Sequence, residues 1–291
     1  MKAIVACVLS FVACGWAWAG VSFAGPAAGV QATTRPAAPF KIIATDSGFE
    51  APATLSAGLR HIVFENRGST IHEAMLVKLP DGMTPAAYVD RIRHGQLFPE
   101  GALDYSGAGL TSPGEAVEIW TRVDPGHYVL ICWNGDHATT VPLRAFTVLA
   151  DGSPDDTPPK EDAVLKLGDF RFELHGRLRS GSRVIRVETP GPSMHELDIF
   201  RLRGDHTAAD VNRWRKREDS GSPSETTGPA DALGGLLDSH DIKRVSWLRQ
   251  NFRPGRYVLH CEMPMDPTAV AGRVDVTHAD AGMVQEFEVA P

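Results

Sequence analysis

Four side chains in the C-terminal half of the chain carry the donor atoms of a soft metal site: His195, Cys261, His278 and Met283. Two neutral imidazoles, one thiolate and one weak thioether form the donor set that copper prefers when it cycles between Cu(I) and Cu(II). Hard oxygen ligands would favour magnesium or calcium, whereas four thiolates would favour zinc or an iron–sulfur cluster. The residue types therefore predict one copper site in this half of the chain.

The N-terminal half carries three matching residues: His72, Cys132 and His137. Where the C-terminal half has Met283, however, this half has Pro142, whose side chain offers no ligand atom. Two interpretations stay open. Either the three residues form a copper site without an axial ligand, which would favour Cu(I), or they are the remains of a former site whose domain now serves as a scaffold. The donor chemistry favours a bound metal.

These residues occupy the same places in an internal repeat. The segment "PGHYVLIC", which ends at Cys132, matches "PGRYVLHC", which ends at Cys261. The segments "TPAAYVDRIRHG" and "TAADVNRWRKRED" each predict an amphipathic helix that begins after a capping threonine, Thr84 or Thr207. Short alternating runs such as "HIVFEN" and "VEIWTRV" predict strands between Gly, Pro and Asp turns. We therefore expect an all-β fold in which each half is a small β-sandwich with one inserted helix.

The order His, then Gly-x-Tyr-x-x-x-Cys, then His-x-x-x-Gly-Met resembles the cupredoxins, the family of blue or type 1 copper proteins. The resemblance extends over both halves, nearly the whole of the mature chain. It implies two Greek-key β-sandwiches in tandem, with copper held at one end of the sandwich. The ligands that it implies are His195, Cys261 and His278, with Met283 axial, in the second half and, without an axial ligand, His72, Cys132 and His137 in the first.

Two features depart from the family pattern. The loop from Cys261 to His278 is longer than usual, and this length could reshape the site or its docking surface. Many members also have Asn after the first histidine, where it helps to hold the cysteine, but this chain has Glu73 and Glu196. Because neighbouring hydrogen bonds tune such sites, the reduction potential does not follow from the resemblance.

The N-terminus has the pattern of a secretory signal peptide, with Lys2, an apolar run and the small-x-small site Ala17-Trp18-Ala19. We expect cleavage after Ala19, export to the periplasm or the medium, and no membrane-spanning segment in the mature chain. A retained anchor is disfavoured because the apolar run is short for a span. Cleavage before Cys14, which would give a lipoprotein, is a further alternative.

The expected domain organisation follows from the repeat and from a Pro- and Asp-rich stretch between its copies. It comprises a signal peptide at 1–19, a flexible lead at 20–38, a cupredoxin-like domain at 39–149, a linker at 150–162 and a second cupredoxin-like domain at 163–291. Outside the signal peptide only Cys132 and Cys261 remain, and each ends the same strand of its own repeat, so we expect no disulfide between them. With a formal net charge of −7 and no basic patch, the chain is not expected to bind nucleic acid.

We expect an exported one-electron carrier with type 1 copper in its C-terminal half, which meets other exported redox proteins by transient docking. One alternative is a protein that stores or delivers copper without redox turnover. Another is an enzyme related to two-domain copper oxidases or nitrite reductases, which would need further histidines for a catalytic copper. His260, beside Cys261, would be one of them, but Phe200 stands where nitrite reductases have another. We therefore expect His260 at the surface and no catalytic residues.

Overall fold

The computed structural model describes residues 38–168, 170–219, 228–241, 243–266 and 276–291. The predicted signal peptide at 1–19 lies outside the described residues, as does the predicted lead at 20–38 apart from its last residue. Within the described ranges, no helix has both the length and the apolar character needed to cross a bilayer. The chain from Ala37 to Pro291 forms one compact unit.

Period-two patterns in the sequence become strands with one buried face. In the first strand, for example, Phe40, Ile42 and Ala44 are buried, whereas the residues between them are half-buried. The first half of the chain contributes β1 (Phe40–Thr45), β2 (Gly48–Glu50), β3 (Thr54–Ser56), β4 (Gly58–Asn66), β5 (His72–Leu79), α1 (Pro85–Arg93), β6 (Leu103–Thr111), β7 (Ala116–Val123), β8 (Gly126–Ile131), α2 (His137–Thr140) and β9 (Arg144–Leu149).

The second half repeats most of this order. It contributes β10 (Ala163–Gly168), β11 (Arg171–His175), β12 (Gly181–Glu188), β13 (Leu197–Leu202), α3 (Ala208–Asp219), β14 (Ala230–Leu236), β15 (Val245–Phe252), β16 (Gly255–His260) and β17 (Val284–Val289). Within the described residues, the short strand β3 and the one-turn helix α2 have no counterpart in this half. The internal repeat seen in the sequence is therefore a repeat of structure.

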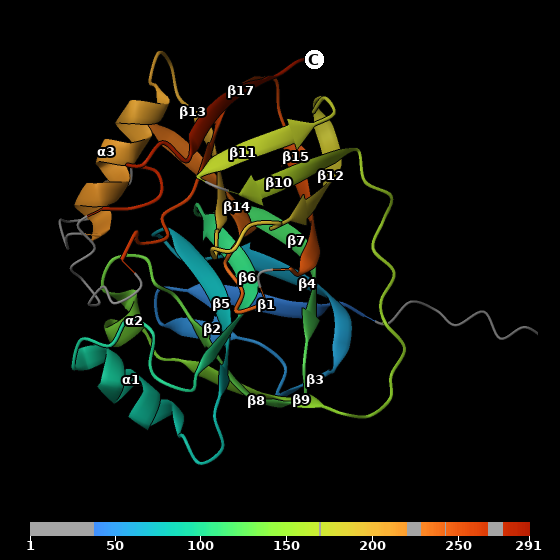
Figure 1. The fold of residues 1–291 in the computed structure, drawn as a ribbon, viewed down its shortest axis with the longest axis vertical. Coiled ribbons are helices and arrows are strands. Elements are labelled where there is room, and N and C mark those ends of the chain that lie inside the picture. Colours follow the sequence, from blue (N-terminus) through green and yellow to red (C-terminus); the bar gives the residue numbers. More distant parts are fainter. Residues whose placement is uncertain (1–37, 169, 220–227, 242, 267–275) are drawn as a thin grey trace, which may run out of the picture. The chain divides into compact units, whose positions relative to one another are not determined.

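The strands form two sheets, and each sheet contains strands of both halves (Figure 1). One has the order β11-β10-β12-β15-β7-β4-β1-β2, and the other has the order β17-β16-β13-β14-β6-β5-β8-β9-β3. The halves join where β15 pairs with β7 and β14 pairs with β6, both antiparallel. One buried cluster contains apolar residues of both halves, among them Phe64, Leu76, Leu165 and Leu259. The division into two domains at residues 150–162 stays a prediction.

Each half has the predicted inserted helix, α1 between β5 and β6 and α3 between β13 and β14. Thr84 caps α1, because its Oγ1 accepts the N–H of Ala87 at 3.1 Å. In α3, Val211 and Trp214 are buried in an apolar cluster with residues of the neighbouring strands. The expected fold class, all-β with two sheets and one helix inserted in each half, is confirmed.

Candidate metal centre

Strand order brings the three C-terminal candidates together. The strands β13, β16 and β17 are neighbours in one sheet. Because β16 runs antiparallel to both of the others, its end meets the starts of β13 and β17. His195 lies just before β13, Cys261 directly follows β16, and His278 lies in the loop that leads into β17. Residues far apart in the sequence therefore converge at one end of the sheet.

The three donor atoms of this cluster face one another. Nδ1 of His195 lies 3.0 Å from Nδ1 of His278, and Sγ of Cys261 lies 3.4 Å from the same Nδ1 of His278. All three residues are buried, and one ligand atom from each lies within 4.8 Å of the others. Since His and Cys bind a transition metal at about 2.0–2.1 and 2.3 Å respectively, these separations leave room for one shared ion. The donor set and its spacing fit a copper ion.

Met283, the predicted axial residue, is fully buried and belongs to the same core cluster as Cys261. Its N–H donates to the carbonyl of His278 at 2.8 Å, which closes the loop between them. Gly282 has a φ of 106°, a conformation that side chains with a Cβ rarely adopt, so glycine allows the chain to turn inward here. The thioether and the imidazole of His278 thus come from one compact loop. Axial ligation by Met283 stays a prediction.

Phe170, which the sequence analysis did not single out, packs edge-on against both imidazoles. Its ring centroid lies 4.7 Å from that of His278 and 6.0 Å from that of His195. Phe170 sits in the turn between β10 and β11 with a φ of 57°, an uncommon value for a residue with a side chain. The aromatic ring therefore forms part of the packing around the two imidazoles. Only its place in a hairpin turn beside the site could have signalled this role.

Burial favours the neutral forms of His278 and Cys261. It lowers the pKa of His278 to about 4, with a further contribution from His195, and it raises the pKa of Cys261 well above its ordinary value. A neutral imidazole is the form that binds a metal, whereas the thiol must lose its proton on binding. His278 is therefore a ready nitrogen ligand, whereas a bound cation would favour the ionised form of Cys261.

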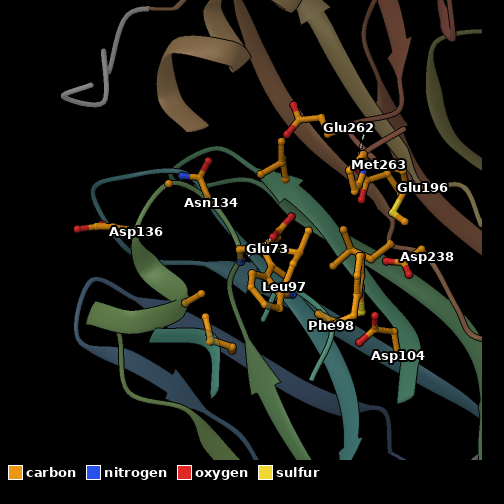
Figure 2. A pocket seen from close by; sticks show the side chains of 18 of the residues that line it. Glu73, Leu97, Phe98, Asp104, Asn134, Asp136, Glu196, Asp238, Glu262 and Met263 are labelled. Carbon is orange, nitrogen blue, oxygen red and sulfur yellow. Dashed lines mark hydrogen bonds between the residues drawn. The ribbon is translucent and has the colours of Figure 1, made fainter. Parts of the chain in front are cut away.

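Glu196 and Glu73, the departures from the family pattern, hold the cysteine loops. The N–H of Glu196 lies 3.5 Å from Sγ of Cys261, and its Oε1 accepts the N–H of Glu262 at 2.7 Å. Glu73 makes the same two contacts in the first half, with Sγ of Cys132 at 3.5 Å and the N–H of Trp133 at 2.7 Å. Both glutamates line the cavity drawn in Figure 2. The carboxyl group of each glutamate thus hydrogen-bonds the residue after the cysteine, and so connects the cysteine loop with β5 in the first half and with the start of β13 in the second.

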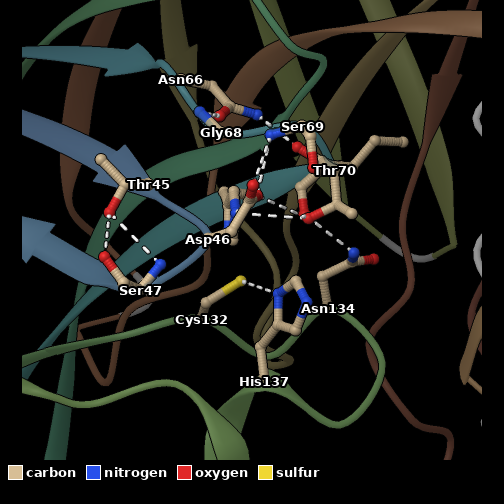
Figure 3. Close-up of polar contacts among 12 residues, drawn as sticks. Thr45, Asp46, Ser47, Asn66, Gly68, Ser69, Thr70, Cys132, Asn134 and His137 are labelled. Atoms are coloured by element: carbon tan, nitrogen blue, oxygen red, sulfur yellow. Dashed lines mark hydrogen bonds and ion pairs between the residues drawn. The ribbon is translucent and has the colours of Figure 1, made fainter.

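The first half brings His72, Cys132 and His137 together in the same way. Figure 3 shows Cys132 and His137 of this cluster side by side. Sγ of Cys132 lies 3.4 Å from Nδ1 of His137, and the rings of His72 and His137 stack with centroids 4.7 Å apart. Nε2 of His72 lies 3.3 Å from Oδ1 of Asp46. Hydrogen bonds from Ser69 lower the pKa of Asp46 to about 2, so this carboxylate is ionised and can only accept. Nε2 of His72 therefore carries its proton.

That proton leaves a lone pair on Nδ1 of His72. Nδ1 is buried and has no hydrogen-bond partner within the described part of the chain. A buried nitrogen without a partner is costly unless a ligand satisfies it, and the carboxylate–histidine pair is a common way to orient a metal-binding imidazole. Pro142, at the position of Met283, is exposed to solvent. The first cluster therefore fits a metal held by three residues.

Cys132 and Cys261 are both free and buried, as expected. The expectation of a surface position for His260 is wrong, because His260 is only 1% exposed. It projects from the opposite side of β16 to Cys261, where Nε2 lies 3.2 Å from Oδ1 of Asn212 on α3 and Nδ1 lies 3.5 Å from Glu262. The helix covers this face of the strand, which the strand pattern alone could not reveal. Phe200 also packs edge-on against His260, with ring centroids 5.8 Å apart.

A buried arginine links the segments that follow the two cysteines. Nε of Arg215, on α3, donates to Oε1 of Glu262 at 2.6 Å, and its Nη2 donates to Oδ1 of Asn134 at 3.0 Å. Glu262 directly follows Cys261, and Asn134 lies two residues after Cys132. Although burial alone would raise the pKa of Glu262, the Arg215 charge holds it below its ordinary value. Arg215 therefore links the segments that follow the two cysteines, by an ion pair with Glu262 and a hydrogen bond to Asn134.

Each half thus places His, Cys and His at the adjoining ends of three neighbouring strands in a two-sheet β-fold. The fold is cupredoxin-like. This is the architecture that the sequence resemblance implies, and the inserted helices α1 and α3 are additions within it.

No protein-family model matches the chain, and no curated protein sequence matches it. Among solved structures, the chain is similar to reduced auracyanin from the photosynthetic bacterium Roseiflexus castenholzii (20% identity, 40% of this chain and 99% of that chain, TM-score 0.27). It is also similar to a multicopper oxidase (12% identity, 86% of this chain and 88% of that chain, TM-score 0.25). A third similar structure is the Cu-containing nitrite reductase from Thermus scotoductus SA-01 (13% identity, 87% of this chain and 61% of that chain, TM-score 0.24). At these values the likeness carries no information on activity, and the interpretation of the site rests on its own geometry.

Proposed function

We propose that the chain is a copper-binding one-electron carrier whose copper is held by His195, Cys261 and His278, with Met283 as the axial ligand. The observation that carries the proposal is the buried approach of the three donor atoms, at 3.0 Å between the two Nδ1 atoms and 3.4 Å between sulfur and nitrogen. Two imidazoles and one thiolate are a set that copper favours over harder metals. Bound copper would supply a centre that accepts and returns one electron.

The protein's contribution to electron transfer is a donor set that hardly has to move. Glu196 anchors the cysteine loop through its backbone N–H and its carboxyl group, and the loop between His278 and Met283 is closed by its own hydrogen bond. Phe170 packs edge-on against both imidazoles, which limits their movement. A site held this firmly keeps similar geometry in both oxidation states, so little reorganisation accompanies the transfer of an electron.

Two exposed apolar side chains beside the site support docking to a redox partner. Met265 is 41% exposed and Val276 is 51% exposed, and the N–H of Met265 donates to the carbonyl of Val276 at 2.9 Å. His278 lies two residues after Val276 in the chain. We propose that transient contacts with exported redox proteins form here, in the periplasm or outside the cell.

The test is to load the purified mature protein with Cu(II) and to record its visible spectrum during reduction and reoxidation. An intense blue band that disappears and returns with one electron per copper supports the carrier. A colourless protein that holds only Cu(I) would remove this proposal and would favour copper storage or delivery.

Storage or delivery is the second candidate, and the first cluster favours it. His72, Cys132 and His137 converge without a thioether, and Nδ1 of His72 is turned toward the cluster by Asp46. A three-coordinate site of this kind would favour Cu(I). Titration with copper under reducing conditions distinguishes the candidates, because two coppers per chain support a role for the first cluster in holding metal, and one copper leaves it as scaffold.

We propose a carrier rather than an enzyme. His260, the residue that a catalytic copper would need, is engaged by Asn212 and Glu262 and packed beside Phe200. Its pKa is lowered to about 4 by burial, so it is a neutral group enclosed by the protein. We expect no turnover of nitrite or of phenolic donors by the copper-loaded protein. Turnover at a rate comparable to that of an oxidase or a nitrite reductase would overturn this part of the proposal.

A further inference from the structure

A cavity of about 480 Å³ lies between the two halves (Figure 2). Along the chain it borders both His-Cys-His clusters, because Glu73, Trp133, Glu196 and Glu262, which follow His72, Cys132, His195 and Cys261, line it. In the first half its walls come from β5, β6, α1 and the segment after Cys132. In the second half they come from Glu196 before β13, Arg215 of α3 and the segments after β14 and β16. This volume falls within the range of about 300–1,000 Å³ that is typical of sites for small organic molecules. Phe98, on its rim, is 37% exposed, so the cavity is open to solvent there.

The cavity combines an apolar wall with an acidic end. Met75, Leu97, Phe98, Trp133 and Leu237 line the apolar part. Asp104, from β6, and Asp238, just after β14, lie near each other at one end of it (Figure 2). The two carboxyl groups interact electrostatically, because the charge of Asp104 contributes to raising the pKa of Asp238. Such a surface suits a molecule with an apolar body and one positively charged end.

One oxygen of Asp238 is the atom of this acidic group that lacks a partner. Asp238 is 3% exposed, and its Oδ2 has no hydrogen-bond partner among the residues that the structure describes. The other buried carboxyl groups of the cavity are engaged: Glu73 and Glu196 accept backbone N–H groups, and Glu262 pairs with Arg215. A buried carboxylate oxygen without a partner is costly, and a bound donor would remove that cost.

The geometry favours an organic cation over a bare metal ion. The cavity is far larger than an ion needs, and part of its wall is apolar. Within the described residues, the sets of three or more donors that could hold a metal are the two His-Cys-His clusters, and neither includes Asp238. A primary ammonium group offers three N–H donors, enough for Asp238 and Asp104 together.

We propose that this cavity binds a small organic cation, a primary ammonium group on an apolar body, with the ammonium group on Asp238 and Asp104 and the body against Phe98 and Trp133. Burial raises the pKa of Asp104 to about 7, which agrees with a pair of carboxyl groups that lacks a counter-charge. The proposal does not depend on copper at either cluster.

The test is calorimetric titration of the mature protein, copper-loaded and metal-free, slightly above neutral pH. The probes are benzylammonium and butylammonium, with benzyl alcohol as the uncharged analogue and calcium chloride as the metal arm. We expect both ammonium probes to bind in the two forms of the protein, and benzyl alcohol to bind at least about tenfold more weakly. We expect Asp238→Asn to lower the affinity for the ammonium probes by at least about tenfold, because one hydrogen bond to a charged group is lost.

Two comparisons keep the outcome decisive. Asp81→Asn, on the exposed loop before α1, is the matched control and should bind as the wild type does. Asp238→Asn should unfold at the same temperature as the wild type or higher, because it replaces a buried carboxyl group whose Oδ2 has no hydrogen-bond partner among the described residues. If this variant does not fold, Asp104→Asn takes its place. Failure of both ammonium probes to bind, equal binding to Asp238→Asn, equal binding of benzyl alcohol, or binding of calcium alone would each overturn the proposal.

Discussion

Nδ1 of His195 lies 3.0 Å from Nδ1 of His278, inside the core and beside the sulfur of Cys261. At this separation one neutral imidazole can donate its Nδ1 proton to Nδ1 of the other. With a metal bound there, both nitrogens and the sulfur can serve as ligands at once. This arrangement leads to the first two predictions.

Cys261→Ser should abolish the intense visible band of the Cu(II)-loaded protein, because a hydroxyl group replaces the soft thiolate. The measurement is the visible spectrum of protein loaded with one equivalent of Cu(II). Cys132→Ser is the matched control, since it changes the corresponding residue of the first cluster. It should leave the visible band of the second cluster unchanged. A Cys261→Ser protein that stays blue would show that the ligand assignment is wrong.

Met283→Leu should keep the blue band and raise the reduction potential, because loss of an axial donor destabilises Cu(II) more than Cu(I). Leucine has a similar volume, so the fold should lose less than about 1.5 kcal/mol of stability. A redox titration followed at the visible band measures the shift. An unchanged potential would mean that Met283 does not contact the copper.

Asp46→Asn should weaken copper binding at the first cluster by about 10–100-fold, the usual effect of removing a carboxylate that orients a ligating histidine. The neutral amide holds the Nε2 proton of His72 less firmly, so Nδ1 is less well directed toward Cys132 and His137. Competition with a Cu(I) chelator measures the affinity. The blue band of the second cluster should not change, and equal affinity in variant and wild type would contradict the role given to Asp46.

Arg215→Met should destabilise the protein by about 3–5 kcal/mol, because it leaves the charge of Glu262 buried without its partner. Denaturant unfolding at neutral pH measures the loss. Arg213→Met, an exposed position on the same helix, is the control and should change stability by no more than about 0.5 kcal/mol. The double variant Arg215→Met, Glu262→Met should recover much of the loss; a double variant as unstable as the single one would show that the ion pair is not the cause.

Asp104→Asn should reduce the dependence of stability on pH. Burial raises the pKa of Asp104 from 3.8 to about 7, so the folded protein keeps a proton that the unfolded chain releases. The contribution to stability is complete below about pH 4 and is lost as the pH rises to about 7. Urea unfolding across this range should therefore show a shallower decline for Asp104→Asn than for the wild type. Equal slopes would contradict the raised pKa.

Local patterns predicted the secondary-structure elements well, and the candidate ligands lie close together in the fold. Period-two runs became strands, Thr84 caps the helix that it was expected to begin, and His195, Cys261 and His278 converge as the repeat suggested. These properties are visible in the sequence because side-chain chemistry, strand periodicity and helix capping depend on neighbours along the chain. The position of His260 was mispredicted because the helix that buries it is distant in the sequence.

The sequence by itself determined which donor atoms exist, their order, and the duplicated β-rich segments that carry them. The tertiary structure decided which atoms of those residues face each other, that Phe170 packs against the imidazoles, and that Asp46 orients His72. It also decided that both sheets run through the two halves and leave a cavity between them. The physical reason is that side-chain direction and burial follow from long-range packing, where residues without any common sequence pattern share one enclosed space.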